Sequence, residues 1–523
     1  MISRCLRRAA CVAVLAIPAI RRADAQSVVS RMPADRAVGI NPDAHLVLTF
    51  STPPTIGTSG KIRIYDAADH AEVDSLDLAI PAGPDPSRRV AVTAANGIPL
   101  DSAIPTSPRT TTPAVRFTPA DIHTYQVNTI GGLPDFHFYP VIVHGNTATI
   151  ALHNNVLRYG HRYIVRIDPG VLTFPAGAFA GYASDDAWTF ATKPSAPRAD
   201  ADRVVVAADG SGDFNTVQGA ADFVPDHPAK RVTIFIRNGT YEEIVFVRNK
   251  TNLTFRGEDR DKVQVGYANN SGFNPPQPGP NRRCAFSVYE STGIELVNFS
   301  VSNTAYGQAE GLLVYGSRNI VSNVTIRGSG DALNTRGSVY LTDCTIIGDG
   351  DTILGVGPAF FNHCEIQSLG PFMWIRNTEE NHGNVFVNST FMVRDRPPLA
   401  QGARLAAPAL PAGTPPRAAV PGVGSVFARL PNNNGINYPF AEAVLIDSHL
   451  KDIPPIGWGP IEGDTNHLHF WEFNSTDLDG KPIDISHRDP ASRQLTMPAD
   501  AATIATYRNP TFVLGGWTPV LGK

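Results

Sequence analysis

The sequence predicts an all-β protein in which an antiparallel β-sandwich precedes a right-handed parallel β-helix. Two observations predict this order. Short alternating strands fill residues 27–197, and a repeat of 20 to 25 residues runs through much of residues 203–523. The composition agrees, because 42% hydrophobic and 18% charged residues over 523 positions are typical of folded globular chains. A chain of this length normally forms more than one domain.

The first region has the strand pattern of a sandwich, with alternating apolar and polar residues between turns. These segments are residues 46–51, 61–65, 90–93, 147–152 and 163–167. The opening MPADRAVGINPDAHLVLTFS and the closing segments LRYGHRYIVRIDPGVL and DDAWTFAT resemble bacterial Ig-like domains of exported proteins. No cluster of catalytic residue types occurs here. We therefore expect a spacer or adhesion module that is dispensable for chemistry, followed by a linker at 193–202.

The second region repeats one template, in which a polar residue follows apolar residues and another apolar residue comes three places later. The polar positions are Asn298, Asn323, Asp343, His363, Asn388 and Asp447. They are 25, 20, 20 and 25 residues apart, and the last follows 59 residues later, after an insertion. Units this short bury a core only when stacked. The spacing favours a parallel β-helix over a propeller, whose blades need about 40–50 residues each.

Two segments stand outside these patterns. Residues 1–25 have the features of a secretory signal: three early arginines, a short apolar run at 9–20 and an A-x-A site ending at Ala25. The run is too short to span a bilayer, so we expect an exported protein that is secreted or periplasmic. Residues 397–424 are rich in Pro, Ala and Gly and should form a loop. We expect this loop to lie near the functional cleft, because it comes just before Arg429; a solvated insertion far from the cleft is the alternative.

The charge argues against two classes of partner. The formal net charge is −4, and loss of five Arg and one Asp with residues 1–25 changes it to −4 − 5 + 1 = −8. A mildly acidic protein is a poor ligand for nucleic acid and for anionic membranes. We expect neither as a partner, and we expect a monomer.

Three cysteines remain after the predicted signal. Cys344 and Cys364 each follow the polar residue of a repeat, so they should occupy equivalent places in consecutive coils. Neighbouring strands lie about 4.8 Å apart, which is within the range that a disulfide tolerates. A bridge and two stacked free thiols are both compatible with this spacing, and Cys284 has no partner in the pattern.

Three further polar residues recur at intervals of one coil. Gln308, Asp331 and Asp351 are 23 and 20 residues apart and should form a short ladder on one face. Two carboxylates about 5 Å apart do not both ionise easily, so one should hold a proton near neutral pH. Such a pair can supply a nucleophile beside an acid. Asp in a turn also has an ordinary conformational explanation, which holds for either residue alone.

The second region contains a series of further motifs. They are VVVAADGSGDFNTVQGAADFVP (204–225), RVTIFIRNGTYEEIVFV (231–247), TNLTFRGED (251–259), GQAEGLLV, GDALNT, GDGDTILG, FARLP (427–431) and GW (457–458). In the order and spacing of these motifs, the region from about 203 to 519 resembles the pectin methylesterase family. One residue is missing between the two Asp turns, and 397–424 is an insertion.

The resemblance implies a role for each of four residues. Asp351 would be the nucleophile on the ester carbonyl, and Asp331 the general acid and then base. Gln308 would donate to the developing oxyanion, and Arg429 would hold the Asp351 carboxylate. The implied reaction is covalent acyl transfer that releases methanol from methyl-esterified pectin, with no cofactor and no metal.

The sequence departs from the family in the residues around these four. Gly330 stands where the family has a second glutamine, which removes one oxyanion donor. Positions that are aromatic or bulky in the family are occupied by Asn334, Thr352, Leu354 and Pro431. Fewer aromatic rings weaken stacking on sugars, so these departures affect the predicted substrate more than the predicted chemistry.

Two other classes of protein remain as alternatives. A pectate lyase-like enzyme would need a calcium-binding carboxylate cluster, which Asp343, Asp349 and Asp351 could imitate, although Asp343 occupies a repeat position. A non-catalytic carbohydrate-binding or cell-surface β-helix would explain the Ig-like region and the missing aromatic residues. His467 and His469 have the residue types of zinc ligands, but without a third ligand nearby we expect them to be strand residues.

Overall fold

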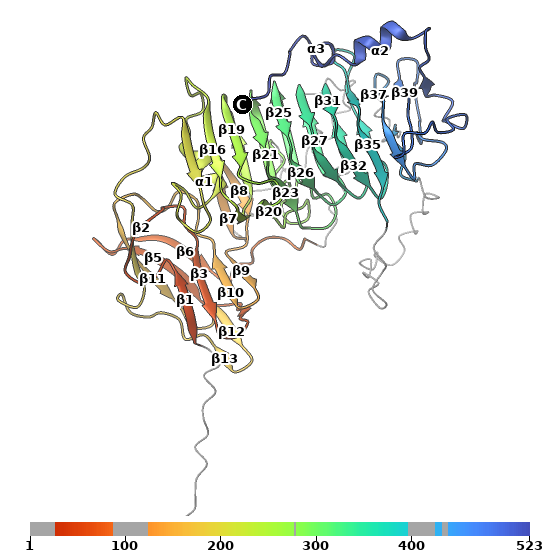
Figure 1. Cartoon of the computed structure of the whole chain (residues 1–523). Helices are drawn as coiled ribbons and strands as arrows, with labels where there is room; N and C mark the ends of the chain where they lie inside the picture. The colour runs from red at the N-terminus through yellow and green to blue at the C-terminus, as the bar shows by residue number, and fades with distance from the viewer. Residues whose placement is uncertain (1–26, 87–123, 277–278, 396–423, 431–437, 523) are drawn as a thin grey trace, which may run out of the picture.

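The computed structural model describes residues 27–86, 124–276, 279–395, 424–430 and 438–522. A β-sandwich comes first and a long stack of parallel strands follows (Figure 1). The predicted signal, the predicted strand at 90–93, Pro431 and all of the predicted 397–424 loop except Gly424 lie outside the described residues. None of the helices within the described ranges is long and apolar enough to cross a membrane.

The sandwich contains two main sheets that pack around one apolar core. One has the order β1 (Val28–Met32), β3 (Leu46–Phe50), β10 (Thr147–Ile150), β9 (Val141–His144). The other has the order β2 (Ala37–Ile40), β14 (Thr189–Thr192), β11 (Arg162–Ile167), β5 (Lys61–Asp66), β6 (Glu72–Asp77). A small sheet of β13 (Gly177–Ala178), β12 (Leu172–Phe174) and β4 (Thr55–Ile56) and a hairpin of β7 (Val127–Ile130) and β8 (Leu133–His137) complete it.

The predicted alternation is present in the sandwich strands. In β3 the side chains of Leu46, Leu48 and Phe50 are buried, while the residues between them are partly exposed. Successive side chains of a strand point to opposite faces, so this pattern turns one face of the strand into the core. The pairing is antiparallel except between β14 and β2, which run parallel. The prediction of a purely antiparallel sandwich is wrong for this one pair.

The second region is a parallel β-helix with three long sheets. The first has the order β15 (Arg203–Val206), β16 (Val232–Ile236), β19 (Leu253–Gly257), β22 (Glu295–Val297), β25 (Asn319–Ser322), β28 (Val339–Thr342), β31 (Ala359–Asn362), β34 (Asn384–Val387), β37 (Glu442–Ile446), β39 (His469–Phe473), β40 (Arg493–Gln494). The second has the order β17 (Gly239–Glu242), β20 (Val263–Tyr267), β23 (Ser300–Asn303), β26 (Thr325–Arg327), β29 (Thr345–Ile347), β32 (Glu365–Ser368), β35 (Thr390–Val393), β38 (His449–Lys451).

The third sheet is the one that matters for function, and we call it the site sheet. Its order is β18 (Val245–Arg248), β21 (Phe286–Thr292), β24 (Leu312–Ser317), β27 (Leu333–Arg336), β30 (Ile353–Gly355), β33 (Met373–Ile375), β36 (Ala428–Arg429). Helix α1 (Val217–Phe223) lies near the start of the β-helix, and α2 (Ala501–Tyr507) and α3 (Pro510–Val513) lie near its far end (Figure 1). The predicted β-helix is thus confirmed.

The repeated polar residue of the template has a conformational reason. Its φ angle is positive at every predicted position, with 63° at Asn298, 52° at Asn323, 56° at Asp343, 50° at His363, 51° at Asn388 and 53° at Asp447. The chain turns there between the first sheet and the second, in a left-handed conformation that Asn and Asp tolerate better than most residues. Asp343 therefore has a structural explanation that needs no metal.

Stacked apolar side chains fill the β-helix, and the cysteines belong to this core. Phe361 and Phe386, in successive coils, stack with ring centroids 4.2 Å apart. Cys344 and Cys364 are buried in the same cluster and are free thiols, as is buried Cys284. Of the two arrangements that the sequence left open, the structure has the stacked thiols.

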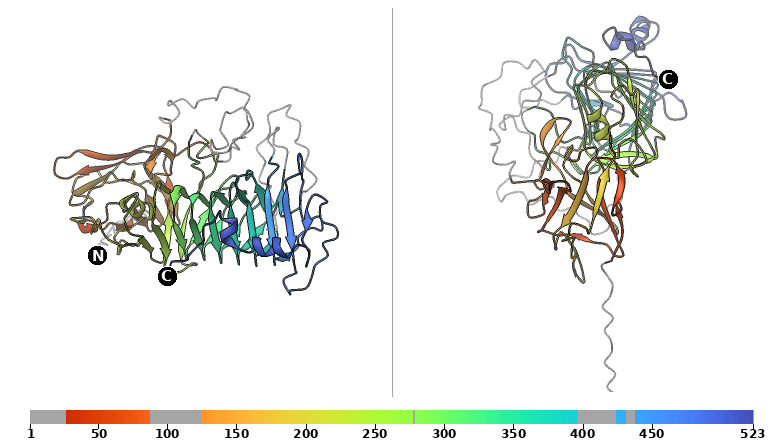
Figure 2. Two further views of the ribbon diagram at one scale, coloured as in Figure 1. Left: turned by 90° about the horizontal axis from the view of Figure 1, so that it is seen from above. Right: turned by 90° about the vertical axis from the view of Figure 1, so that its left-hand side faces the viewer.

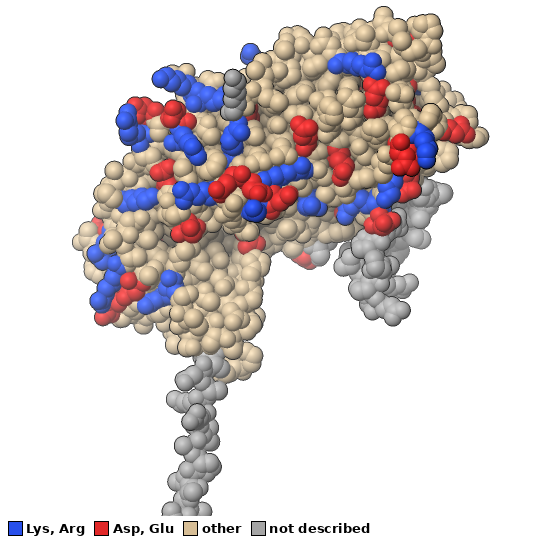
Figure 3. Space-filling view, in the orientation of Figure 1, with Lys and Arg blue, Asp and Glu red and all other residues tan. Residues whose placement is uncertain are grey.

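The sandwich packs directly on the β-helix, against its N-terminal coils (Figure 2). A shared cluster of buried residues joins them: Ile130, Leu133 and Phe136 of the β7–β8 hairpin, with Ile244, Phe246, Tyr267, Phe273, Cys284, Tyr289 and Leu313 of the β-helix. The two regions are therefore connected by a common apolar core as well as by the chain at 193–202. On the face shown in Figure 3, basic and acidic side chains are interspersed.

Candidate active site

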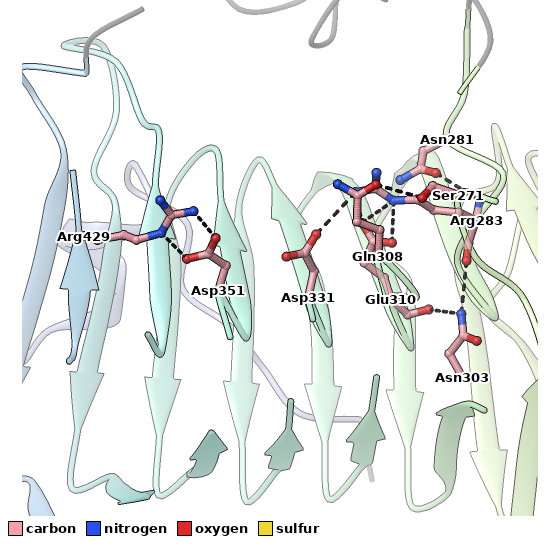
Figure 4. A network of polar contacts seen from close by, with 9 residues as sticks. All are labelled: Ser271, Asn281, Arg283, Asn303, Gln308, Glu310, Asp331, Asp351 and Arg429. Atoms are coloured by element: carbon pink, nitrogen blue, oxygen red, sulfur yellow. Dashed lines mark hydrogen bonds and ion pairs between the residues drawn. The ribbon is translucent and has the colours of Figure 1, made fainter. Parts of the chain in front are cut away.

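The site lies on the outer surface of the β-helix, along the site sheet (Figure 4). Gln308, Asp331 and Asp351 come from three successive coils, and Arg429 comes from the second coil after that of Asp351. Gln308 precedes β24, Asp331 precedes β27, Asp351 precedes β30, and Arg429 lies on β36. Leu333 pairs with Ile353, so the two aspartates, each two residues earlier, occupy the same place in neighbouring coils. Gln308 and Asp351 both have a φ of 45°, in the left-handed region. This conformation is uncommon for residues other than glycine, and Gln tolerates it less well than Asp does.

Asp351 is held by Arg429. The Nε of Arg429 donates to Oδ1 of Asp351 at 2.6 Å, and Nη2 of the same guanidinium donates to Oδ2. Two parallel bonds of this type orient a carboxylate as well as pairing its charge. The guanidinium of Arg429 in turn lies over the ring of Trp374, 5.0 Å from its centroid. Asp351 thus has a fixed orientation, one coil away from Asp331.

Asp331 has a different environment. Its Oδ2 lies 3.4 Å from Nη2 of Arg283, a longer and weaker contact than the pair at Asp351. Burial, the largest cause, raises the pKa of Asp331 to about 8, and the nearby charge of Glu310 adds to the rise. Arg283 opposes the rise, and the charge of Asp351 is a smaller cause than either. The direction of this pKa shift is the predicted one, but its main cause is burial and not repulsion from Asp351.

Arg283 and Glu310 are site residues that sequence reasoning missed. The Nε of Arg283 donates to Oε1 and Oε2 of Glu310 at 2.8 and 2.6 Å, and Glu310 is fully buried. Asn303 fixes both by donating from Nδ2 to the carbonyl oxygens of Arg283 (3.1 Å) and Glu310 (2.9 Å). Glu310 gave a signal in the sequence, because it is a carboxylate two places after Gln308 and just before the apolar strand β24. Arg283 had none, because the segment 268–284 has no repeat.

Gln308 is oriented by a neighbouring loop. The hydroxyl of Ser271 donates to Oε1 of Gln308 at 2.8 Å. This bond places the carbonyl end of the side-chain amide against Ser271 and leaves the Nε2 end as the donor for another group. Ser271 is also a residue that the sequence alone did not indicate.

Two of the positions that depart from the resembled family, Asn334 and Leu354, belong to a row on the site sheet that continues through Trp374 and Arg429. Asn334, Leu354, Trp374 and Arg429 are paired in register from one coil to the next. Asn334 and Leu354 are only 2% and 4% exposed, so neither offers an open surface to a sugar ring. Thr352 is completely buried and donates to Ser368 Oγ. Trp374 is the partly exposed aromatic residue of this row.

The alternative metal site has no support in the described ranges of the chain, where no three His, Cys, Asp or Glu side chains gather in a way that could hold an ion. Asp349 instead accepts from Ser329 Oγ at 2.9 Å and pairs with Arg394 at 3.1 Å. His469, at the start of β39, contacts Glu442 at 2.8 Å, and the ring of His467 stacks on Phe440.

The comparison with family models matches the region of the chain that contains Gln308, Asp331 and Asp351. Residues 203–390 match the family model described as Pectinesterase. "Probable pectinesterase 30" of Arabidopsis thaliana is 27% identical over 280 residues, which are 52% of this chain and 52% of that protein. "Probable pectinesterase 56" of the same plant is 30% identical over 173 residues, or 32% of this chain and 59% of that protein.

The chain spans about half the length of the first curated relatives that it matches, with 52%, 49% and 49% of their lengths covered. Among solved structures, "Pectin methylesterase from Carrot" aligns with a TM-score of 0.47 and 22% identity, covering 60% of this chain and 93% of that one. The match to the Pectinesterase family model thus covers residues 203–390 of a chain that also contains the sandwich.

Proposed function

We propose that this protein is a carboxylic ester hydrolase that removes methyl groups from methyl-esterified pectin. The observation that carries the proposal is the contrast between two aspartates in the same place of neighbouring coils. Asp351 is paired with Arg429 through two hydrogen bonds, whereas burial raises the pKa of Asp331 to about 8. One carboxylate is thus oriented for attack while the other holds a proton at neutral pH.

In the first half of the reaction, a carboxylate oxygen of Asp351 attacks the ester carbonyl carbon. The carbonyl oxygen becomes negatively charged, and Nε2 of Gln308 donates to it. The carbon–oxygen bond to the methoxy group then breaks while Asp331 gives its proton to that oxygen, so methanol leaves. The product is an anhydride between Asp351 and the sugar carboxyl group.

In the second half, Asp331 is an ionised base. It takes a proton from water, whose oxygen attacks the acyl carbon of the anhydride and displaces the Asp351 carboxylate. The sugar leaves as a free carboxylic acid, which then ionises, and Asp331 regains its proton. Arg429 supports both halves by holding Asp351 in one orientation.

Methanol release from highly esterified pectin is the direct test. We expect methanol without any shortening of the polymer, and we expect Asp351→Asn to abolish it. De-esterified polygalacturonate, assayed in parallel for unsaturated products, is the control for a lyase. Unsaturated products would favour the lyase-like alternative. A folded wild-type protein that acts on neither substrate would favour the carbohydrate-binding alternative.

We also propose that residues 27–197 are an Ig-like domain and residues 203–523 the catalytic domain of an exported, monomeric protein. The two packed sheets around one core and the predicted signal at 1–25 support this assignment. N-terminal sequencing of the protein recovered outside the cytoplasm should begin after Ala25. Light scattering should give the mass of one chain, and a dimer mass would contradict the monomer.

A further inference from the structure

We infer that the sandwich positions the oxyanion donor Gln308, through the loop at residues 269–274. This inference rests on the proposed function, because it gives His137 and Tyr139 of the sandwich a role in that reaction. They are positioning residues: they contact the loop, and the loop contacts Gln308. The sandwich would then be part of the catalytic unit instead of a dispensable spacer.

The first link joins the end of β8 to the loop by hydrogen bonds. The backbone N–H of His137 donates to Oδ1 of Asn274 at 2.8 Å, and Nδ2 of Asn274 donates to the carbonyl oxygen of His137 at 3.2 Å. The Nδ1 of His137 lies 2.6 Å from the carbonyl oxygen of Phe273. Because a carbonyl only accepts, this Nδ1 carries the proton. Burial lowers the pKa of His137, which favours the neutral ring.

Aromatic packing strengthens the same link. The rings of Tyr139 and Phe273 stack with centroids 4.4 Å apart and an interplanar angle of 12°. The backbone N–H of Tyr139 donates to the hydroxyl of Tyr267 at 2.8 Å. Gly83 of the sandwich region approaches so closely that a Cβ there would lie 2.5 Å from a ring carbon of Phe273. The sandwich therefore holds Phe273 from two sides.

Inside the loop, Asn270 connects the sandwich to the segment before Gln308. Its Nδ2 donates to the carbonyl oxygens of Pro86, in the sandwich region, and Tyr306, at 3.0 and 2.8 Å. Its Oδ1 accepts from the backbone N–H groups of Gly272 and Phe273 at 3.0 and 2.8 Å. Asn270 is only 2% exposed, so these bonds are shielded from water.

The second link runs from the loop to the amide of Gln308. The backbone N–H of Ser271 donates to the carbonyl oxygen of Gln308 at 3.2 Å, and its hydroxyl donates to Oε1 at 2.8 Å. One residue thus fixes both the main chain and the side chain of Gln308. Ser271 lies two residues before Phe273, which the sandwich holds. A displaced loop would release Oε1 and allow the amide to rotate, and a rotated amide presents an acceptor where the oxyanion needs a donor.

A second contact between the sandwich and the β-helix, away from the 269–274 loop, offers a matched control. There Oδ2 of Asp43, in the sandwich, accepts from the backbone N–H groups of Asn215 and Thr216 at 2.9 and 2.8 Å, next to the start of α1. These bonds hold the two regions together but involve no residue of the 269–274 loop. Asp43→Asn should therefore loosen the contact between the regions without disturbing Gln308.

The experiment compares kcat, KM and thermal stability on methyl-esterified pectin for the full-length wild type, Ser271→Ala, His137→Ala and Asp43→Asn. Loss of one oxyanion donor costs about 10²–10³ in kcat. We expect kcat to fall up to about that much in Ser271→Ala and roughly 10-fold in His137→Ala, with KM nearly unchanged. Ser271→Thr, which keeps the hydroxyl, should recover most of the loss. Asp43→Asn should lower the melting temperature but leave kcat within about twofold.

Amide hydrogen exchange of residues 269–274 measures how firmly the sandwich holds this loop, independently of activity. The exchange should become faster in His137→Ala. If His137→Ala does not fold, Gly83→Ala replaces it, because this change removes no hydrogen bond and presses on Phe273. An active wild type whose kcat is unchanged in the folded sandwich variant would overturn this inference alone. A folded wild type without esterase activity would overturn the proposed function as well.

Discussion

At the scale of single residues, the two aspartates have unequal environments although the repeat places them equivalently. Asp351 meets Arg429, which comes from a coil beyond a long insertion, and Asp331 meets Arg283, which is already paired with buried Glu310. The ladder of carboxylates thus acquires its asymmetry from residues outside the repeat. Asymmetry of this kind separates an attacking carboxylate from a proton donor.

Substitution of each aspartate should separate the two roles. Asp351→Asn should abolish methanol release, because the amide is a poor nucleophile. Asp331→Asn should lower the rate by about 10²–10⁴, the usual cost of losing a positioned acid–base group. Burst-phase methanol measurements and steady-state rates distinguish the loss of the nucleophile from the loss of the acid–base group. Full activity in a folded Asp351→Asn protein would end the assignment of the nucleophile.

The pKa of Asp331 predicts the pH dependence of both rate and stability. Alcohol departure needs the protonated acid, so kcat should decline above about pH 8, and this decline should be absent from the residual activity of Asp331→Asn. The folded pKa of about 8 is above the ordinary 3.8, so between these values the unfolded chain binds fewer protons than the folded one. Stability from this group therefore falls as pH rises through that window.

The predicted effect of Asp331 on the pH dependence of stability is measured by thermal unfolding. The melting temperature of Asp331→Asn, relative to wild type, should rise between about pH 4 and pH 8 and stay level above it. Asp349→Asn, at a partly exposed ion pair near the site, is the comparison variant and should not show this trend. A constant difference between Asp331→Asn and wild type across the range would contradict the protonated state of Asp331.

At the scale of elements, the left-handed turn residue of each coil should limit the stability of the β-helix. His363 has a φ of 50° and is exposed, so its replacement tests the backbone with little change in packing. We expect His363→Gly to be about 1 kcal/mol more stable than His363→Ala, because Ala resists this conformation and Gly does not. Urea denaturation gives both free energies of unfolding.

Exposed Glu379, which has no positive φ, is the matched position for this comparison. There the Ala variant should be at least as stable as the Gly variant, because Gly loses more chain entropy on folding. If the Ala and Gly variants have the same order of stability at both positions, the left-handed turn carries no measurable strain.

At the scale of the whole molecule, the shared apolar cluster changes the expectation for truncation. The sequence predicts that residues 198–523 fold and act without the sandwich. In the structure, Phe246, Tyr267, Phe273 and Leu313 of that fragment are between 1% and 5% exposed, and they share a cluster with the β7–β8 hairpin that covers them. We therefore expect the fragment to unfold at a lower temperature and to bind hydrophobic dyes. A fragment as stable and active as the full chain would contradict this prediction and the positioning role of the sandwich.

The sequence by itself determined the features that depend on local period. Alternating residues predicted the sandwich strands, and recurring polar residues such as Asn323 and Asp343 predicted the coils, because a fixed period places equivalent residues one above another. The same period placed Asp331 and Asp351 in neighbouring coils. The tertiary structure decided the contacts that have no period: the pairing of Arg283 with Glu310, the bond between Ser271 and Gln308, and the packing of the sandwich on the loop at 269–274. These contacts join segments far apart in the chain, and their geometry exists only after the coils have stacked and the two regions have met.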